Sequence, residues 1–207
     1  MSGPVDAGAL LDFWFGTSEV EAGGPLDGRP ARPEWFGKRQ AFDDAVRDRF
    51  GGLLDTIRAA GGLALLGPWV KGPSADAGTR LAFVLACDQL PRNAWRDQAD
   101  AFVLDPLALA CARDMVRRGE DTQLAPLARW FVYLPFEHSE ALADQDEAVR
   151  LFGSLRDDPG AGGGYEWAVK HRDVIVRFGR FPHRNAILGR ESTPEEAAFL
   201  SEPGSRF

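Results

Sequence analysis

The feature that most constrains this chain is the helical spacing of its apolar residues, which recurs along the whole sequence, while the alternation typical of strands is scarce. Glycine and proline divide this pattern into segments that are separated mostly by short loops. Short loops place consecutive helices antiparallel in helical folds. The sequence therefore predicts an all-α fold of about eight to ten antiparallel helices in a single domain over residues 1–207.

The ends of these helices can be placed from capping and breaking residues. Gly16 ends the first helix, and Pro91 is expected to stop a later one because proline cannot continue a helix. Asp105 is expected to cap a helix whose first position is Pro106. We expect helices over 9–16, 35–60 with an interruption near Gly51-Gly52, 75–90, 106–118, 125–134, 139–156, 165–179 and a short one from 194.

Loops and the last helix are indicated by composition. A Gly/Pro-rich stretch over 17–33 is long for a loop within one domain, which is typical of a mobile or functional segment. Gly61-Gly62 is expected to close the second long helix, and the glycine run over 157–164 to separate two later ones. Thr193 with Glu196 forms the pattern of a capping box.

Charge and cysteine content limit the classes of function. The net charge of −7 argues against non-specific binding to nucleic acid. No run of about 18 apolar residues is long enough to span a membrane, and the amino terminus lacks the pattern of a signal peptide. Cys87 and Cys111 lie in apolar helical stretches and are expected to be free thiols, as suits a cytoplasmic protein.

The acidic charge is not evenly spread. Residues 170–190 contain six Lys or Arg and one acid, Asp173, so that this segment carries +5. Two interpretations stay open: a localised site for an anion, or a basic helix paired with acidic residues elsewhere.

Asp88 is the first candidate functional residue. The apolar stripe formed by Leu81, Val84 and Leu85 continues one turn further to Asp88. A buried carboxylate is unfavourable unless it is paired, and we expect its partner among Arg92, Arg180 and Arg184. The pair is either a purely structural link or part of a ligand site.

The predicted helix over 165–179 carries His171 on an apolar stripe. The other members of this stripe are Trp167, Val174 and Phe178. A histidine there is either a satisfied core residue or a ligand-binding group. On another face of the helix, Asp173 and Arg177 have the spacing of an intrahelical pair.

The segment RFGRFPHRN follows that helix. Its glycine and proline turn the chain, and two phenylalanines can anchor it. With Arg177 paired, Arg180 is left free, so that Arg180, His183 and Arg184 could hold a phosphate or carboxylate. Asn185 caps the next turn or contributes to the site.

A second polar stretch is LPFEHSE at 134–140. Glu137 and His138 could act as an acid–base pair or bind a metal, while Ser139 is expected to cap the following helix. The sequence contains neither HExxH nor CxxC, and neither GxGxxG nor GxxxxGK[ST]. We therefore expect no metal or cofactor.

Several strings resemble the bacterial family called domain of unknown function 924. They are LLDFWFG, EWFGK, DQLPRN at 88–93, YLPFEHSE at 133–140, FGRFPHRN at 178–185 and LGRESTPEE at 188–196. The resemblance implies an all-α, tetratricopeptide-like helical array and no established activity. The polar residues that it marks are Asp88, Gln89, Arg92, Asn93, His138, Ser139, Glu140, Arg180, His183, Arg184 and Asn185.

These observations predict a polar pocket for a small anionic metabolite or a peptide carboxylate, and whether it catalyses a reaction is left open. The expected site residues are Asp88, Arg92, Asn93, Glu137, His138, His171, Arg180, His183, Arg184 and Asn185. The alternative is a protein-interaction module of the tetratricopeptide type, in which the same polar residues form structural ion-pair networks.

Overall fold

The computed structural model describes residues 6–59 and 76–205, and these contain nine α-helices, three short 3₁₀ helices and no β-strand. The predicted all-α fold of eight to ten helices is thus confirmed. The α-helices are α1 (Ala7–Phe15), α2 (Pro33–Phe36), α3 (Gln40–Ala59), α5 (Ala77–Ala94), α6 (Asp105–Arg118), α7 (Pro126–Glu137), α8 (Leu142–Gly153), α9 (Gly164–Phe178) and α10 (Pro194–Leu200). The 3₁₀ helices are η1 (Ala99–Phe102), η2 (Asp121–Gln123) and η3 (Pro182–Arg184).

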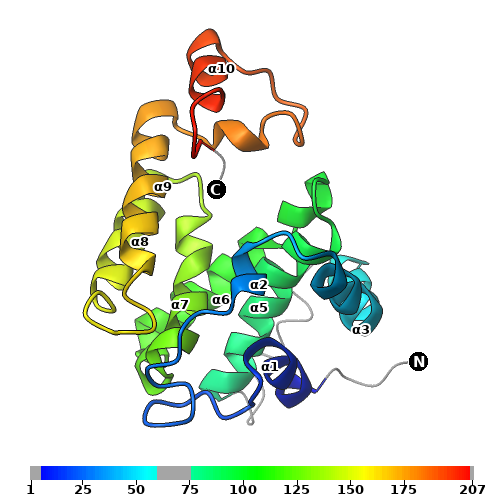
Figure 1. Ribbon diagram of the computed structural model, residues 1–207, viewed down its shortest axis with the longest axis vertical. Coiled ribbons are helices and arrows are strands. Elements are labelled where there is room, and N and C mark those ends of the chain that lie inside the picture. The colour runs from blue at the N-terminus through cyan, green and yellow to red at the C-terminus, as the bar shows by residue number, and fades with distance from the viewer. Residues whose placement is uncertain (1–5, 60–75, 206–207) are drawn as a thin grey trace.

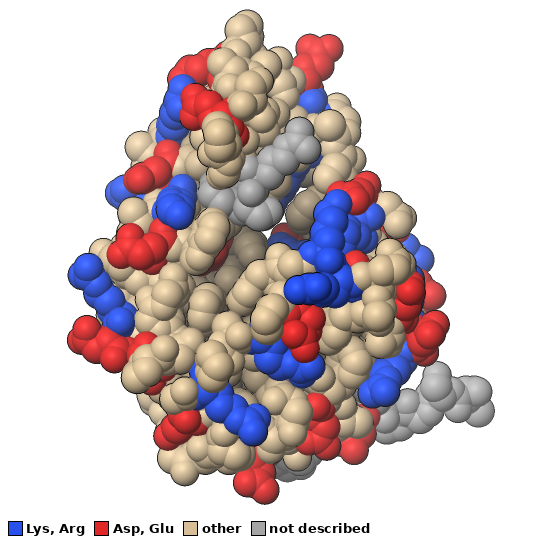
Figure 2. All heavy atoms as spheres, viewed as in Figure 1, with Lys and Arg blue, Asp and Glu red and all other residues tan. Residues whose placement is uncertain are grey.

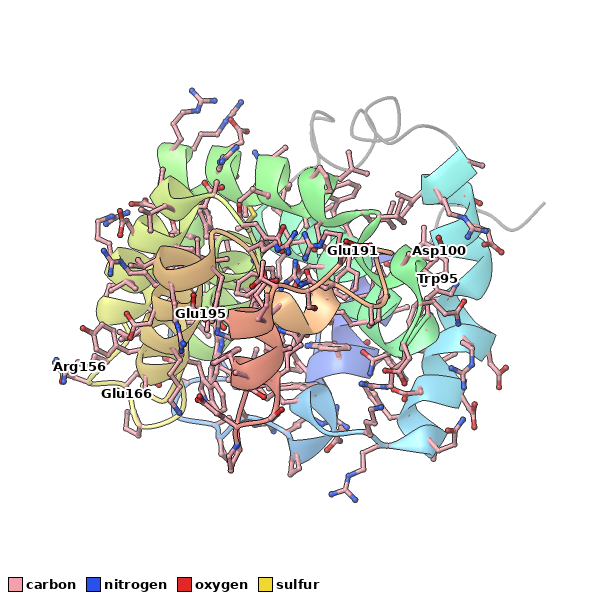
Figure 3. The ribbon with its side chains drawn as sticks, turned by 90° about the horizontal axis from the view of Figure 1, so that it is seen from above. Trp95, Asp100, Arg156, Glu166, Glu191 and Glu195 are labelled. Carbon is pink, nitrogen blue, oxygen red and sulfur yellow. The ribbon has the colours of Figure 1, made fainter. Side chains whose placement is uncertain are left out.

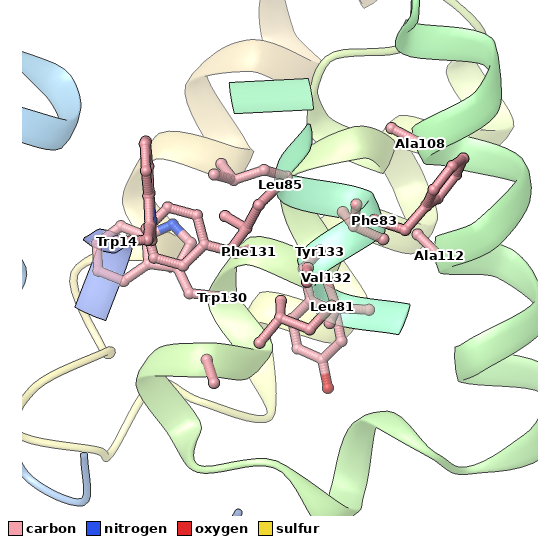
Figure 4. Packing of buried hydrophobic residues seen from close by; sticks show 14 of the residues in the cluster. Trp14, Leu81, Phe83, Leu85, Ala108, Ala112, Trp130, Phe131, Val132 and Tyr133 are labelled. Atoms are coloured by element: carbon pink, nitrogen blue, oxygen red, sulfur yellow. The ribbon is translucent and has the colours of Figure 1, made fainter. Parts of the chain in front are cut away.

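Helix α5 lies at the centre of the molecule. It packs against α1, α3, α6 and α7, and 16 of its 18 residues are buried. A helix that is apolar on nearly all sides is stable only when other helices surround it. Phe83 of α5 lies against α6 where the small residues Ala108 and Ala112 leave room for its ring (Figure 4).

The other helices form two groups around this centre. Helices α7, α8 and α9 lie side by side, while α1, α2 and α3 lie on the opposite side of α5 (Figure 1). The last described segment, with η3 and α10, sits above α9 (Figure 1). It has its own small apolar cluster, formed by Val174, Ile175, Phe178, Phe181 and Phe199, which is separate from the main core.

The predicted helix over 35–60 is wrong in two respects. It is split, because α2 ends at Phe36 and α3 begins only at Gln40. Trp35 stacks on Trp14 and donates its indole N–H to the Trp14 carbonyl at 3.1 Å, which fixes α2 against α1. The expected break at Gly51-Gly52 does not occur, because buried side chains before and after the two glycines keep α3 against the core. Gly61-Gly62 lies outside the described residues.

Pro91 does not stop its helix, which continues to Ala94. The last turn is held by tertiary contacts: Asn93 donates to Asp43 at 2.8 Å, and Arg92 pairs with Asp105. These contacts outweigh the hydrogen bond that proline lacks.

Asp105 does not cap α6, because it is itself the first residue of that helix and Leu104 takes the cap position. Its carboxylate is directed to Arg92 instead. Other boundary predictions are confirmed: Gly16 ends α1 with φ of 78°, and Thr193 and Glu196 form the expected capping box.

Three further expectations have clear outcomes. Cys87 and Cys111 are buried free thiols, as predicted. Within residues 6–59 and 76–205, no helix combines the length and the apolar character that crossing a membrane requires. Trp167 is not part of a buried stripe, because 47% of its surface is exposed.

Candidate functional site

Five elements bring polar residues together at the upper end of the molecule. They are the last turns of α5, the start of α6, the end of α7, the middle of α9, and η3. Figure 3 looks down on this end, with Trp95 and Asp100 on the side of α5 and η1 and Glu195 of α10 on the other. We call the residues that meet here the polar cluster: Asp88, Arg92, Asp105, Glu137, His138, His171, His183 and Arg184.

The surface beside this end is not flat. Figure 2 shows that the face seen in Figure 1 is hollowed near its centre, and Lys and Arg atoms lie along one edge of the hollow. Within the polar cluster, Arg92, Asp105 and His138 keep 20%, 20% and 14% of their side-chain surface exposed. The cluster is therefore partly exposed to solvent.

Asp88 and His138 form the central pair of the cluster. Nδ1 of His138 lies 2.7 Å from Oδ1 of Asp88, while Gln89 donates to Oδ2 at 2.6 Å. Asp88 is fully buried, yet the cation of Arg92 and the bonds from His138 and Gln89 outweigh burial and lower its pKa. The carboxylate is ionised, so that Nδ1 of His138 carries the proton that it donates.

Arg92 links this pair to α6. Its guanidinium lies 3.6 Å from Oδ1 of Asp88 and makes a two-pronged bond with Asp105, at 2.9 and 3.0 Å. It also donates to the backbone carbonyl of Asp88. The expectation that an arginine pairs with Asp88 is confirmed for Arg92, and the carboxylate of Asp105 raises the pKa of Arg92 against the effect of burial.

Arg184 is placed differently from Arg180 and Arg190 of the same segment. Its guanidinium lies over the rings of Phe181 and Phe102, at 4.5 and 4.8 Å from their centroids. It donates to the His138 carbonyl at 3.0 Å, and the nearest carboxylate oxygen of a described residue is that of Asp105, at 3.9 Å. Its Nε is buried without a hydrogen-bond partner among the described residues, and burial together with the charge of Arg92 lowers its pKa to about 10.

Glu137 and His171 form a second buried pair. Nδ1 of His171 donates to the Trp167 carbonyl at 2.9 Å and lies 3.1 Å from Oε1 of Glu137. Burial raises the pKa of Glu137 well above its usual range and lowers the pKa of His171 to about 3. Burial acts on both groups in the direction of the neutral form, so this contact joins two uncharged side chains rather than an ion pair.

Replacing Glu137 by glutamine is expected to stabilise the protein, increasingly so as the pH rises. The folded pKa of Glu137 is raised, so the unfolded chain loses its proton first and the carboxyl group disfavours folding above the unfolded pKa of about 4.3. Glutamine removes this titration. Urea unfolding at pH 4.5, 6 and 8 should give a difference in unfolding free energy that widens with pH, and a difference that is constant with pH would contradict a neutral Glu137.

His183 lies in η3 beside Arg184, with its ring centroid 5.6 Å from that of Phe181. Burial and the charge of Arg184 lower its pKa to about 4. The three histidines of the cluster are therefore all neutral at pH 7, although the segment that supplies two of them is basic in sequence.

Three predicted site residues are engaged elsewhere. Asn93 donates to Asp43, which also binds Arg96. Arg180 makes a two-pronged bond with Glu196, and Asn185 donates to the same glutamate at 3.2 Å. The expectation that Arg180 is left free is wrong, because Glu196 occupies it.

The expected helix pair on α9 is also wrong. Arg177 binds Glu195 of α10 at 3.0 Å, and no ion pair joins it to Asp173 in the described chain. The prediction that Ser139 caps the following helix is wrong, because Ala141 takes the cap position of α8 without a side-chain bond. The hydroxyl of Ser139 accepts from the Ala141 N–H at 3.2 Å and donates to Asp144 at 2.6 Å.

Asp105 and Phe102 were missed as site residues. Asp105 was assigned to helix capping, and its contact with Arg92 links residues 13 positions apart. Phe102 is apolar, so nothing in the sequence marks it as part of a polar site. Arg190 is marked in the sequence only as one of the six basic residues of 170–190. It binds Glu140 through two hydrogen bonds at 2.8 and 3.0 Å and so holds the segment 180–190 against the turn between α7 and α8.

The cluster offers two guanidinium groups and an imidazole for recognition. Among the described residues, no three or more His, Cys, Asp or Glu side chains are arranged so that they could hold a metal ion. The hydroxyl of Ser139 is bound to Asp144 rather than to His138, so a serine–histidine arrangement for nucleophilic attack is absent from this part of the chain. The chemistry available is recognition of a negative charge, with a histidine that can accept a proton.

Comparison with known proteins gives two matches. The family model described as "Bacterial protein of unknown function (DUF924)" matches residues 10–204. A solved structure, the protein of unknown function ATU0120 from Agrobacterium tumefaciens, is 38% identical, with a TM-score of 0.75 over 94% of this chain and 96% of that one. No curated protein matches the sequence.

Proposed function

Because the chain belongs to DUF924, a family of bacterial proteins of unknown function, we propose its function from the site itself: the polar cluster binds a small anion, such as a carboxylate. The observation that carries this proposal is the environment of Arg184. Its guanidinium is buried, and within residues 6–59 and 76–205 it has no carboxylate within 3.5 Å and no hydrogen-bond partner for Nε. A buried cation without a close counter-ion is unfavourable, and an anionic ligand would relieve it.

Neighbouring arginines support this assignment by contrast. Arg180 and Arg190 are each bound by a carboxylate through two hydrogen bonds. The closed ion-pair network that was the alternative interpretation therefore accounts for these two residues. It does not account for Arg184, whose planar fork is suited to a carboxylate and is the least occupied in the cluster.

The experiment compares two arginines of the same segment. In thermal-shift titrations with sodium propionate, sodium lactate and inorganic phosphate, at least one of these anions should raise the melting temperature of the wild type. A ligand at 100 times its Kd adds about 2.7 kcal/mol to the unfolding free energy. Arg184→Gln should abolish this increase, while the matched variant Arg180→Gln should retain it.

The variants also separate a ligand site from a structural role without any ligand. If Arg184 is there to bind an anion, Arg184→Gln should melt no lower than the wild type, because the variant lacks the unpaired buried charge. Arg180→Gln should melt lower, because it leaves buried Glu196 without its partner. A lower melting temperature for Arg184→Gln, together with no stabilisation by any of the three anions, would refute the anion site.

A further inference from the structure

His138 presents a bare ring nitrogen beside the arginines of the cluster. Its Nδ1 donates to Asp88, so Nε2 of the neutral ring carries no hydrogen and can only accept a hydrogen bond. Burial and the nearby charge of Arg92 lower the pKa of His138, which keeps the ring in this neutral form at pH 7. Asp88 thus determines which nitrogen is free.

Nothing in the described chain uses that nitrogen. No described residue donates a hydrogen bond to Nε2, and the side chain keeps 14% of its surface exposed. A hydrogen-bond acceptor held in one orientation, but open to solvent on one side, is suited to a donor group on a ligand.

The acceptor and the cations are fixed to one another. Arg184 donates to the backbone carbonyl of His138 itself, at 3.0 Å. Arg92 lies 3.6 Å from Oδ1 of Asp88, the oxygen that receives the His138 proton. A ligand whose negative charge contacts Arg184 therefore brings its neighbouring atoms close to His138.

The charges of the cluster limit the charge of the ligand. Arg92 and Arg184 carry +2, and Asp88 and Asp105 carry −2, while the histidines and Glu137 are neutral. Glu140, the next acidic residue toward η3, is paired with Arg190. These charges sum to zero without a ligand, so a dianion would add twice the uncompensated charge of a monoanion to a largely buried site, and a monoanion is favoured.

We propose that the anion is a small hydroxy carboxylate, whose carboxylate binds Arg184 and whose hydroxyl donates to Nε2 of His138. This inference rests on the proposed anion site and names its ligand class. The carboxylate supplies the single negative charge, and the hydroxyl supplies the donor that Nε2 lacks. Inorganic phosphate, which carries more charge near pH 7, is expected to bind more weakly.

The test uses two matched pairs of probes that differ in one hydroxyl: lactate with propionate, and mandelate with phenylacetate. Isothermal titration calorimetry on the full chain should show that the hydroxy acid of at least one pair binds about tenfold more tightly than its partner, which corresponds to one hydrogen bond. In nitrogen-15 spectra of the histidine rings, the Nε2 resonance of His138 should shift with that hydroxy acid and not with its partner.

Two substitutions of His138 provide the control. His138→Asn keeps a donor near the position of Nδ1 for Asp88 but has no acceptor at the position of Nε2. In this variant the two acids of each pair should therefore bind about equally well. The affinity for the acid without the hydroxyl, propionate or phenylacetate, should change less than about threefold. His138→Gln places an amide near the position of Nε2 and should restore part of the preference.

The outcomes distinguish this inference from the proposal that it rests on. Equal binding within both pairs, or tighter binding of phosphate, would overturn the hydroxy carboxylate assignment and leave the anion site intact. A preference that survives in His138→Asn would also overturn it. If none of the carboxylates and no phosphate binds the wild type, both proposals are wrong.

Discussion

Replacing Asp88 by alanine is expected to lower the free energy of unfolding by about 3–5 kcal/mol, the range observed when one partner of a buried charge pair is removed. Asp88 is completely buried and binds three neighbours, namely His138, Gln89 and Arg92. Alanine leaves the donors of His138 and Gln89 without an acceptor and deprives Arg92 of one of its two carboxylates.

Urea unfolding followed by circular dichroism at pH 7 measures this effect. Asp88→Asn should lose less stability than Asp88→Ala, because the amide oxygen can still accept from His138 while the charge near Arg92 is lost. The matched control is Asp146→Ala on α8, whose ion pair with Arg172 is exposed at the surface and should contribute less than about 1 kcal/mol. A loss at Asp88 no larger than that at Asp146 would show that the Asp88 network does not stabilise the fold.

Acid is expected to weaken the fold well before ordinary carboxylates titrate, because of His171. Its folded pKa is lowered to about 3, while that of an unfolded histidine is about 6.5. The unfolded chain therefore binds a proton first as the pH falls. The stabilising contribution is fully present above pH 6.5, and it is lost progressively as the pH falls toward the folded pKa. Between pH 7 and pH 4, this group alone should remove about 3 kcal/mol.

The variant His171→Gln isolates this contribution. The difference in unfolding free energy between pH 7 and pH 4 should be smaller in His171→Gln than in the wild type by about that amount. His183 and His138 also have lowered pKa values, so part of the acid sensitivity should remain in the variant. If wild type and variant lose the same stability over this range, His171 is not held neutral in the folded protein.

The helices were predictable where their signals are local. Gly16 and the capping box at Thr193 act within one turn of the chain, and the structure confirms both. The wrong predictions concern helix boundaries that depend on contacts between residues distant in the chain. Pro91 lies inside α5 because residues beyond it bind α3 and α6, and the stretch after Trp35 is broken because that ring docks on α1.

The same distinction holds for the candidate site. Asp88 could be assigned to the interior from its place on an apolar stripe, and its neighbour Arg92 lies one turn away. The sequence could not show which of Arg180, Arg184 and Arg190 has no glutamate partner, because that depends on glutamates that are distant in the chain. Glu196 and Glu140 bind the first and the third and leave the second with the cluster.

We expect the segment after α9 to unfold more easily than the rest of the molecule. It carries His183 and Arg184, yet its apolar contacts belong to the small cluster of five residues rather than to the main core. It is otherwise joined to the rest of the chain by polar contacts, among them Arg190 with Glu140, Arg184 with the His138 carbonyl and Glu195 with Arg177 of α9. Such a unit can open by local unfolding at a free energy far below that of the whole fold. If the proposed anion binds Arg184, its exchange is governed by this local opening equilibrium, so its residence time at the site and the resistance of the whole chain to denaturant are separate quantities.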